Sequence, residues 1–122
     1  RNIVVVDEFR APMNGTIVLP NGNVVASMVL GSKQSTNFDY SHALKTVNIY
    51  VVSQSSLQDS LIPTLNKLIG NGFTDQFYEA AIAELISTGD IVFALHRTGN
   101  RGWVEIDTFE DINKAEELIA LW

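Results

Sequence analysis

Short runs of hydrophobic residues recur along the chain, and most of them predict β-strands. Ile3 to Val6 is a continuous β-branched run, which is typical of a strand buried on both faces. Residues 16–19 and 24–30 flank the sequence Pro-Asn-Gly-Asn at 20–23, where the Asn-Gly pair favours the positive φ values of a tight hairpin. After a polar and aromatic loop, residues 44–52 predict a further strand deep in the sheet.

Helical periodicity dominates the middle of the chain. Leucines recur at helical intervals through residues 53–70, although Pro63 should kink this helix or begin a second one. Thr74 can cap a helix that runs from residue 75 to about residue 87, and Gly89 is placed to end it. The middle of the chain is therefore predicted to be a helical crossover between strands.

The C-terminal third combines two short strands with a final helix. Ile91 to Leu95 and Trp103 to Ile106 predict the strands. Thr108 can cap the helix, with Asp111 as its acidic partner in a shortened capping box. The following apolar residues share one face of this helix: Phe109, Ile112, Ala115, Ile119 and Trp122. Strands mixed with helices predict an α/β fold with a mixed sheet, formed by one domain over residues 1–122.

The amino-acid composition limits the classes of molecule that the chain can be expected to bind. The chain has 122 residues, of which 46% are hydrophobic and 18% charged, and its net charge is −6. This charge argues against nucleic acid and against an anionic membrane, so we expect small molecules or proteins as partners. The absence of cysteine excludes disulfides and a thiolate zinc site, and it favours the cytoplasm. Arg1 in place of methionine is expected of a chain that is processed or truncated at its start.

Glu105 and Asp107 are the first candidate for chemistry. They lie at the end of a predicted strand, directly before a helix, where ligands collect in open α/β sheets. Side chains two positions apart on a strand point to one side, so both carboxylates can face one site and bind Mg²⁺. The alternative is structural: Asp107 stabilises the positive end of the helix, and Glu105 is solvated.

Other catalytic patterns are missing from the sequence. It contains neither a Gly-x-Ser-x-Gly elbow nor a phosphate-binding Gly-x-x-x-x-Gly-Lys loop, and Gly-Asn-Gly at 70–72 follows a predicted helix instead of a strand. His42 and His96 have no spacing that pairs either of them with another metal ligand. These absences leave the two carboxylates as the leading candidate.

The order of motifs resembles the second half of a nucleotidyltransferase domain. The main pieces are KTVNIY at 45–50 and WVEIDTFEDINKAEE at 103–117, with FYEAAIAELI at 77–86 between them. The resemblance is to cytidylyltransferases that act on phosphocholine or on phosphonates such as 2-aminoethylphosphonate. It implies a Rossmann-like three-layer domain, present here only in part. It also implies transfer of a nucleotide from a nucleoside triphosphate to a phosphate or phosphonate oxygen, with release of pyrophosphate.

The resemblance also implies roles for particular residues. Asp107, with Glu105 beside it, would complete a Mg²⁺ site, and Lys45 would face the acceptor or the phosphates. Asn48 would share that task, although it can equally satisfy backbone groups of the sheet. For Lys45 the alternative is a surface lysine at a strand end. The family usually has aspartate where this chain has Asn14, which leaves that segment only the role of a turn.

Tyr78 and Glu79 would hold the ammonium group of the acceptor, if the resemblance extends to the substrate. The alternative for Tyr78 is packing in the core. The family's glycine-rich nucleotide loop and its Asp-x-Asp metal ligand do not occur in this sequence. We therefore expect the chain to be inactive alone and to need a complementing N-terminal half. A rival hypothesis is a non-catalytic homo-oligomeric module that binds a small amine or phosphate, because strands such as Ile3 to Val6 need neighbours on both edges.

Overall fold

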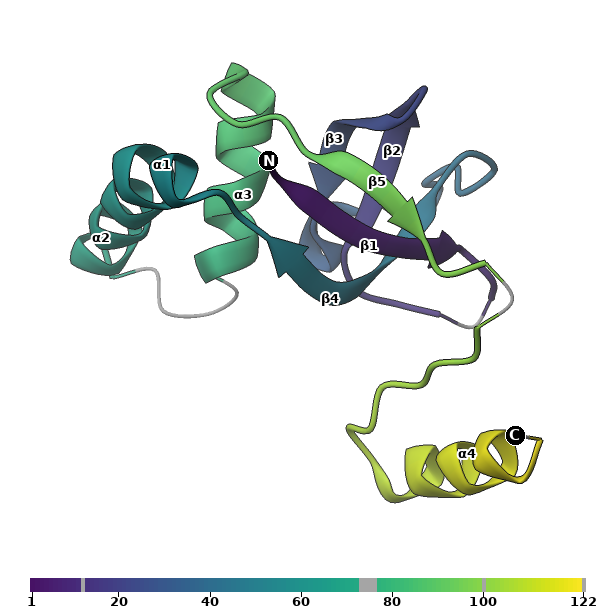
Figure 1. Cartoon of the computed structure of the whole chain (residues 1–122). Helices are drawn as coiled ribbons and strands as arrows, with labels where there is room; N and C mark the ends of the chain where they lie inside the picture. Colours follow the sequence, from purple (N-terminus) through teal and green to yellow (C-terminus); the bar gives the residue numbers. More distant parts are fainter. Residues whose placement is uncertain (12, 73–76, 100, 122) are drawn as a thin grey trace.

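Five short strands close into a barrel in the order β1-β4-β2-β3-β5 (Figure 1). The structure is a computed structural model that describes residues 1–11, 13–72, 77–99 and 101–121. The strands are β1 (Ile3–Glu8), β2 (Ile17–Asn21), β3 (Val24–Val29), β4 (Leu44–Val51) and β5 (Ala94–Arg97). Only β1 and β5 run parallel to each other, while the other neighbouring strands are antiparallel.

The predicted α/β fold, a Rossmann-like nucleotidyltransferase fold with an open mixed sheet, is wrong because the sheet closes on itself. The prediction relied on the run from Ile3 to Val6, which was expected to be buried on both faces. Val4 and Val6 are fully buried, whereas Ile3 and Val5 are only half-buried, so β1 has one inner and one outer face. A β-branched run fits either arrangement, and in this chain the strand belongs to a barrel.

The hairpin prediction is confirmed. β2 and β3 pair from Ile17 opposite Val29 to Asn21 opposite Val24, and the turn places Gly22 at φ 61°. Glycine adopts this left-handed conformation without the steric cost that other residues meet. The strand predicted from Ile91 begins later, at Ala94, because the chain first buries Ile91 in the core.

β4 contains an irregularity that explains its loose alternation of apolar and polar residues. Val4 pairs with Tyr50 and Val6 pairs with Thr46, so three residues of β4 lie opposite one residue of β1. Asn48 lies in this bulge with φ 63°, the only positive φ outside glycine in the described residues. The three residues at the start of β4, Leu44, Lys45 and Thr46, are buried, while the rest of the strand is half-buried or exposed.

Of the helices between β4 and β5, α3 packs against the barrel at β3, and α2 packs against α3 (Figure 1). Pro63 lies at the start of the second α-helix, which confirms that it begins a new helix after a π-helical turn. Gly89, at φ 79°, follows the third helix as predicted. The predicted cap at Thr74 lies outside the described residues. The helical elements are η1 (Gly31–Lys33), α1 (Gln54–Ser56), η2 (Leu57–Leu61), α2 (Ile62–Gly70), α3 (Phe77–Thr88) and α4 (Phe109–Ala120).

The main core lies between the barrel and α3. Inward residues of the strands meet one face of α3, and Phe93 is fully buried among them just before β5. The other buried members of this cluster are Val4, Val6, Val18, Val25, Met28, Leu44, Leu61, Ala81, Ile82, Leu85, Ile86 and Ile91. In the described part of the chain, no helix is long and apolar enough to cross a membrane.

The predicted strand at residues 103–106 is wrong, because these residues belong to no strand. β5 already pairs with both β1 and β3, which leaves no open edge for a further strand at that place. The segment instead leads away from the barrel to α4 (Figure 1). α4 begins as predicted, with a capping box between Thr108 and Asp111.

Phe93→Ala tests the core where β5 joins the barrel. We expect it to lower the free energy of unfolding by about 3–5 kcal/mol, because the truncation empties a fully buried site. Urea unfolding followed by circular dichroism measures this loss. Val92→Ala is the matched control, since Val92 is 61% exposed and its truncation should cost less than about 0.5 kcal/mol. Equal stabilities of the two variants would contradict this placement of β5.

Candidate functional site

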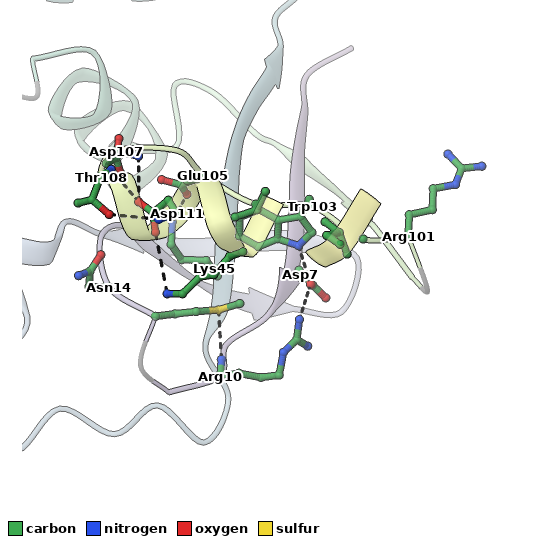
Figure 2. A pocket seen from close by; sticks show the side chains of 15 residues that line it. Asp7, Arg10, Asn14, Lys45, Arg101, Trp103, Glu105, Asp107, Thr108 and Asp111 are labelled. Atoms are coloured by element: carbon green, nitrogen blue, oxygen red, sulfur yellow. Dashed lines mark hydrogen bonds and ion pairs between the residues drawn. The ribbon is translucent and has the colours of Figure 1, made fainter. Parts of the chain in front are cut away.

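A pocket of about 570 Å³ lies between one end of the barrel and the C-terminal segment (Figure 2). Its floor comes from the end of β1, the turn after it and the start of β4. Its outer wall comes from residues 101–107 and α4. The lining residues that carry charge are Asp7, Arg10, Lys45, Arg101, Glu105, Asp107, Asp111 and Lys114, and the others include Met13, Asn14, Trp103 and Leu118.

Lys45 is a buried lysine at the floor of this pocket. Only 4% of the residue is exposed, so the alternative of a surface lysine is wrong. Its Nζ donates to the Thr46 carbonyl at 2.9 Å and to Glu105 Oε1 at 3.1 Å. A buried ammonium requires such acceptors, because desolvation of an unpaired charge is expensive. The Lys45–Glu105 pair thus ties the C-terminal segment to β4.

Glu105 and Asp107 both line the pocket, as the hypothesis of a shared site requires. They do so from an extended segment and not from a strand end. The Glu105 side chain is 37% exposed, and one of its oxygens is engaged by Lys45. Asp107 is exposed, and its backbone N–H donates to Asp111 Oδ2 at 2.9 Å. Two carboxylates on one wall suit Mg²⁺, which binds one or two protein carboxylates and completes its shell with water and phosphate. Within the described residues, no group of three or more metal-ligating side chains forms.

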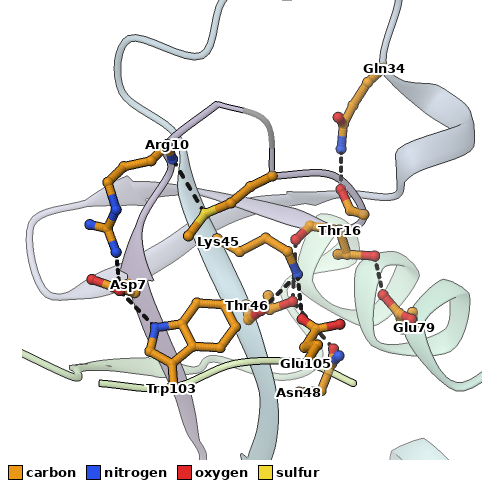
Figure 3. A network of polar contacts seen from close by, with 12 residues as sticks. Asp7, Arg10, Thr16, Gln34, Lys45, Thr46, Asn48, Glu79, Trp103 and Glu105 are labelled. Carbon is orange, nitrogen blue, oxygen red and sulfur yellow. Dashed lines mark hydrogen bonds and ion pairs between the residues drawn. The ribbon is translucent and has the colours of Figure 1, made fainter. Parts of the chain in front are cut away.

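Asn48 and Glu79 lie outside the lining of the pocket, in a polar network behind Lys45 (Figure 3). The Thr16 hydroxyl donates to the Glu79 carboxylate, while the Thr46 hydroxyl lies 3.4 Å from Asn48 Oδ1 and 3.2 Å from the Thr16 carbonyl. The network joins Thr16, directly before β2, to β4 and α3. Asn48 therefore contacts a side chain of its own strand, and Glu79 is already engaged by a hydroxyl.

Tyr78 also lies outside the pocket lining, on α3. Its ring packs edge-to-face on Tyr50 with the ring centroids 6.4 Å apart. Burial raises the pKa of the Tyr78 hydroxyl, and the charge of Glu79 raises it further. The structure thus gathers Tyr78 and Glu79 on one turn of α3, close to the Lys45 network but not inside the pocket.

Asp7 is a central residue of the site that the sequence did not reveal. It is 8% exposed, and it lies directly opposite Lys45 in the β1–β4 ladder. Its Oδ2 accepts from Trp103 Nε1 at 2.7 Å and from Arg10 Nη2 at 2.8 Å, while its Oδ1 accepts from the Glu8 N–H at 2.8 Å. The one available signal was a carboxylate directly after an apolar strand, the same signal that singled out Glu105.

These bonds set the charge state of Asp7. Burial by itself raises the pKa of the carboxyl, but the hydrogen bonds from Trp103, the Glu8 N–H and Arg10, together with the charge of Arg10, outweigh burial and lower it. Asp7 is therefore a carboxylate at neutral pH. The Arg10 guanidinium and the Trp103 indole N–H converge on it at the pocket floor (Figure 3).

The pocket concentrates charge of both signs. It is lined by four of the chain's eight basic residues, although the chain has a net charge of −6. Four carboxylates face the same space, so the lining is balanced. A balanced arrangement favours a ligand that carries an anion and a cation at different positions, or an anion accompanied by a metal ion.

Comparison with known proteins identifies a distant relative. No protein-family model matches the chain. The chain is similar to the CMP-5'-(3-aminopropyl)phosphonate synthase of Streptomyces rubellomurinus (strain ATCC 31215), with 26% identity over 106 residues. The match covers 86% of this chain but only 17% of that protein. The name of this relative agrees with the resemblance that the motifs indicate.

Asp7→Asn tests the electrostatic role of the buried carboxylate. We expect a loss of about 1–3 kcal/mol of stability at pH 7, because charge-assisted hydrogen bonds to a buried group are lost. A carboxyl with a lowered folded-state pKa stabilises above its unfolded pKa of about 4, and this contribution disappears as the pH falls through the folded value.

The difference between wild type and Asp7→Asn should therefore be full at pH 6–7 and shrink below about pH 4. Urea unfolding at several pH values measures it. Asp59→Asn, on an exposed residue of η2, is the control and should change stability by less than about 0.5 kcal/mol. A difference that grows toward acid pH would show that Asp7 is not a stabilising carboxylate.

Proposed function

We propose that the chain supplies the acceptor-binding pocket of a CTP-dependent nucleotidyltransferase whose acceptor is a small phosphonate or phosphate that carries an amine. The observation that carries this proposal is the balanced pocket lining, with Arg10 and Lys45 on the floor and Asp107 and Asp111 on the outer wall. The name of the relative supports it, since that protein is a synthase of a CMP-linked aminoalkylphosphonate.

An aminoalkylphosphonate suits this pocket on chemical grounds. Its phosphonate is anionic and would lie toward Arg10 and Lys45. Its ammonium lies several atoms away and would face the carboxylates of the outer wall. A pocket of about 570 Å³ is large enough for such a ligand and for part of a neighbouring nucleotide. Because both signs of charge must be matched, a ligand lacking either end should bind less tightly.

The reaction itself sets the electrostatic task. A phosphonate oxygen attacks the α-phosphorus of CTP, a new P–O–P linkage forms, and the bond to the β-phosphate breaks as pyrophosphate leaves. The two reacting anions repel each other, so fixed cations must neutralise and align them. Arg10 and Lys45 would serve the acceptor. Glu105 and Asp107 would hold Mg²⁺, which when bound neutralises phosphate charge.

A second candidate function is a non-catalytic assembly module. The sequence suggested such a module because a strand at residues 3–6 would need neighbours on both edges. Both edges are already paired within the chain, because β1 pairs with β4 on one side and β5 on the other. A different observation now favours it: Phe109 is 89% exposed and Ile119 is 62% exposed on α4. Light scattering tests this alternative, which expects a dimer or larger oligomer at micromolar concentration. A monomer across that range would contradict it.

Lys45→Met tests the acceptor pocket. Isothermal titration calorimetry with 3-aminopropylphosphonate should show binding by the wild-type chain and roughly tenfold or greater weakening in the variant. The reason is that Glu105 would lose its ammonium partner and repel the incoming phosphonate. Lys67→Met, an exposed lysine on α2 away from the pocket lining, is the matched control. Equal affinities for all three proteins would contradict the proposed site.

A turnover assay tests the need for a complementing part. The chain incubated with CTP, Mg²⁺ and 3-aminopropylphosphonate should release no pyrophosphate above background, because its sequence contains no glycine-rich phosphate loop. The acceptor should nevertheless bind. Robust turnover by the 122-residue chain would overturn the view that it is inactive alone.

A further inference from the structure

The outer wall of the pocket is attached to the barrel by side chains instead of by a β-ladder. Residues 101–107 form no strand, and in the described structure two polar contacts tie them to the barrel: Trp103 to Asp7 and Glu105 to Lys45. Asp7 is also the residue that holds the Arg10 guanidinium. One buried carboxylate thus fixes both a basic group on the floor and an aromatic group on the wall.

Of the two cations on the pocket floor, Arg10 has the more exposed side chain. Its guanidinium has five N–H donors, and a single nitrogen, Nη2, is bonded to Asp7. Its side chain is 56% exposed, and a turn closed by the Met13 N–H on the Arg10 carbonyl at 2.8 Å fixes its backbone. The bond to Asp7 holds one edge of the guanidinium and leaves the other edge for a ligand.

The other cations of the pocket are less suited to contact an anion directly. Lys45 is buried and already bonded to Glu105 and the Thr46 carbonyl. Lys114 is 62% exposed and lies 3.9 Å from Asp111. Arg101 extends away from the centre of the pocket (Figure 2). This comparison singles out Arg10.

We infer that Arg10 binds the phosphonate group of the acceptor and that Asp7 is the positioning residue that aims it. This inference rests on the proposed function and identifies the residues of the pocket that bind the anionic group. Asp7 aligns the guanidinium for a bidentate contact, and through Trp103 it keeps the wall that bears Glu105 and Asp107 beside the bound anion.

Titration with two ligands tests the role of Arg10. Propylphosphonate carries the anion alone, and 3-aminopropylphosphonate carries both charges. We expect Arg10→Ala to weaken both ligands by a similar factor of roughly 10 to 100, since it removes charge-assisted hydrogen bonds to the shared group. Arg10→Lys should recover only part of this loss, because an ammonium cannot reproduce the bidentate fork.

Arg1→Ala is the matched control, as it removes the same charge at the opposite end of β1 and should change affinity by less than about threefold. If wild type binds neither ligand, the proposed function itself fails. If wild type binds and Arg10→Ala binds equally well, or loses only the ligand with the amine, the role of Arg10 is overturned while the pocket stands. An equal loss of affinity in Arg1→Ala would also overturn the proposed role of Arg10.

A double-mutant cycle tests the positioning role of Asp7. Asp7→Asn should weaken propylphosphonate by about fivefold or more in the parent chain, yet have almost no further effect in the Arg10→Ala background. General structural damage would instead add to the loss in both backgrounds, and that result would overturn the positioning role. If circular dichroism shows that Asp7→Asn is unfolded, Asp7→Glu replaces it in the same cycle, where its displaced carboxylate should give the same non-additive loss.

Discussion

The pairing of β5 with two other strands is the constraint on which the rest of the structure depends. β5 lies parallel to β1 and meets β3 at Val24 opposite Ala94, where N–H groups of Val25 and Leu95 also bond across the seam. Closure leaves the sheet without an open edge and directs its apolar face inward. Because β1 and β5 are parallel, their carboxyl ends lie together. The chain after β5 therefore emerges beside Asp7, and the pocket forms where it turns back.

Side chains attach the outer wall of the pocket to the barrel, whereas hydrogen-bonded β-ladders join the strands within the barrel. The indole of Trp103 and the carboxylate of Glu105 attach the outer wall to buried groups of β1 and β4. Both buried groups gain from the attachment, because a desolvated carboxylate or ammonium is costly unless it is hydrogen-bonded. The same polar groups that line the pocket thus hold it together, which leaves little freedom to substitute them without loss of structure.

Local structure was predictable from the sequence to a greater degree than topology. The hairpin at Gly22, the helix restart at Pro63 and the capping box at Thr108 each follow from short-range chemistry, and each is confirmed. The barrel was not predictable in this way, since a β-branched run does not reveal how many of its faces are buried. The strand expected at residues 103–106 had the right composition, but closure left it no partner.

Spacing along the sequence predicted only the part of the site that lies near in sequence, whereas Lys45 was expected from the family resemblance alone. Glu105 and Asp107 were found because they flank one residue, whereas the connection of Glu105 to Lys45 spans 60 positions and that of Asp7 to Trp103 spans 96. Neither contact leaves a periodic pattern. Two expected acceptor residues, Tyr78 and Glu79, come close to the Lys45 network but outside the pocket lining, because α3 packs against β3 and carries them there.

The energetics of α4 link the fold to the proposed ligand. This 12-residue helix buries only Ala115 and relies on its capping box, and isolated helices of such length are marginal in water. Its wall of the pocket is therefore held mainly by the two polar ties in residues 101–107. A ligand that contacts Arg10 on the barrel and carboxylates on the wall would add a third tie. Under the proposed function, ligand binding and the ordering of the wall are then coupled. A change that loosens the wall lowers the fraction of molecules whose pocket can bind, and the apparent affinity falls in the same proportion.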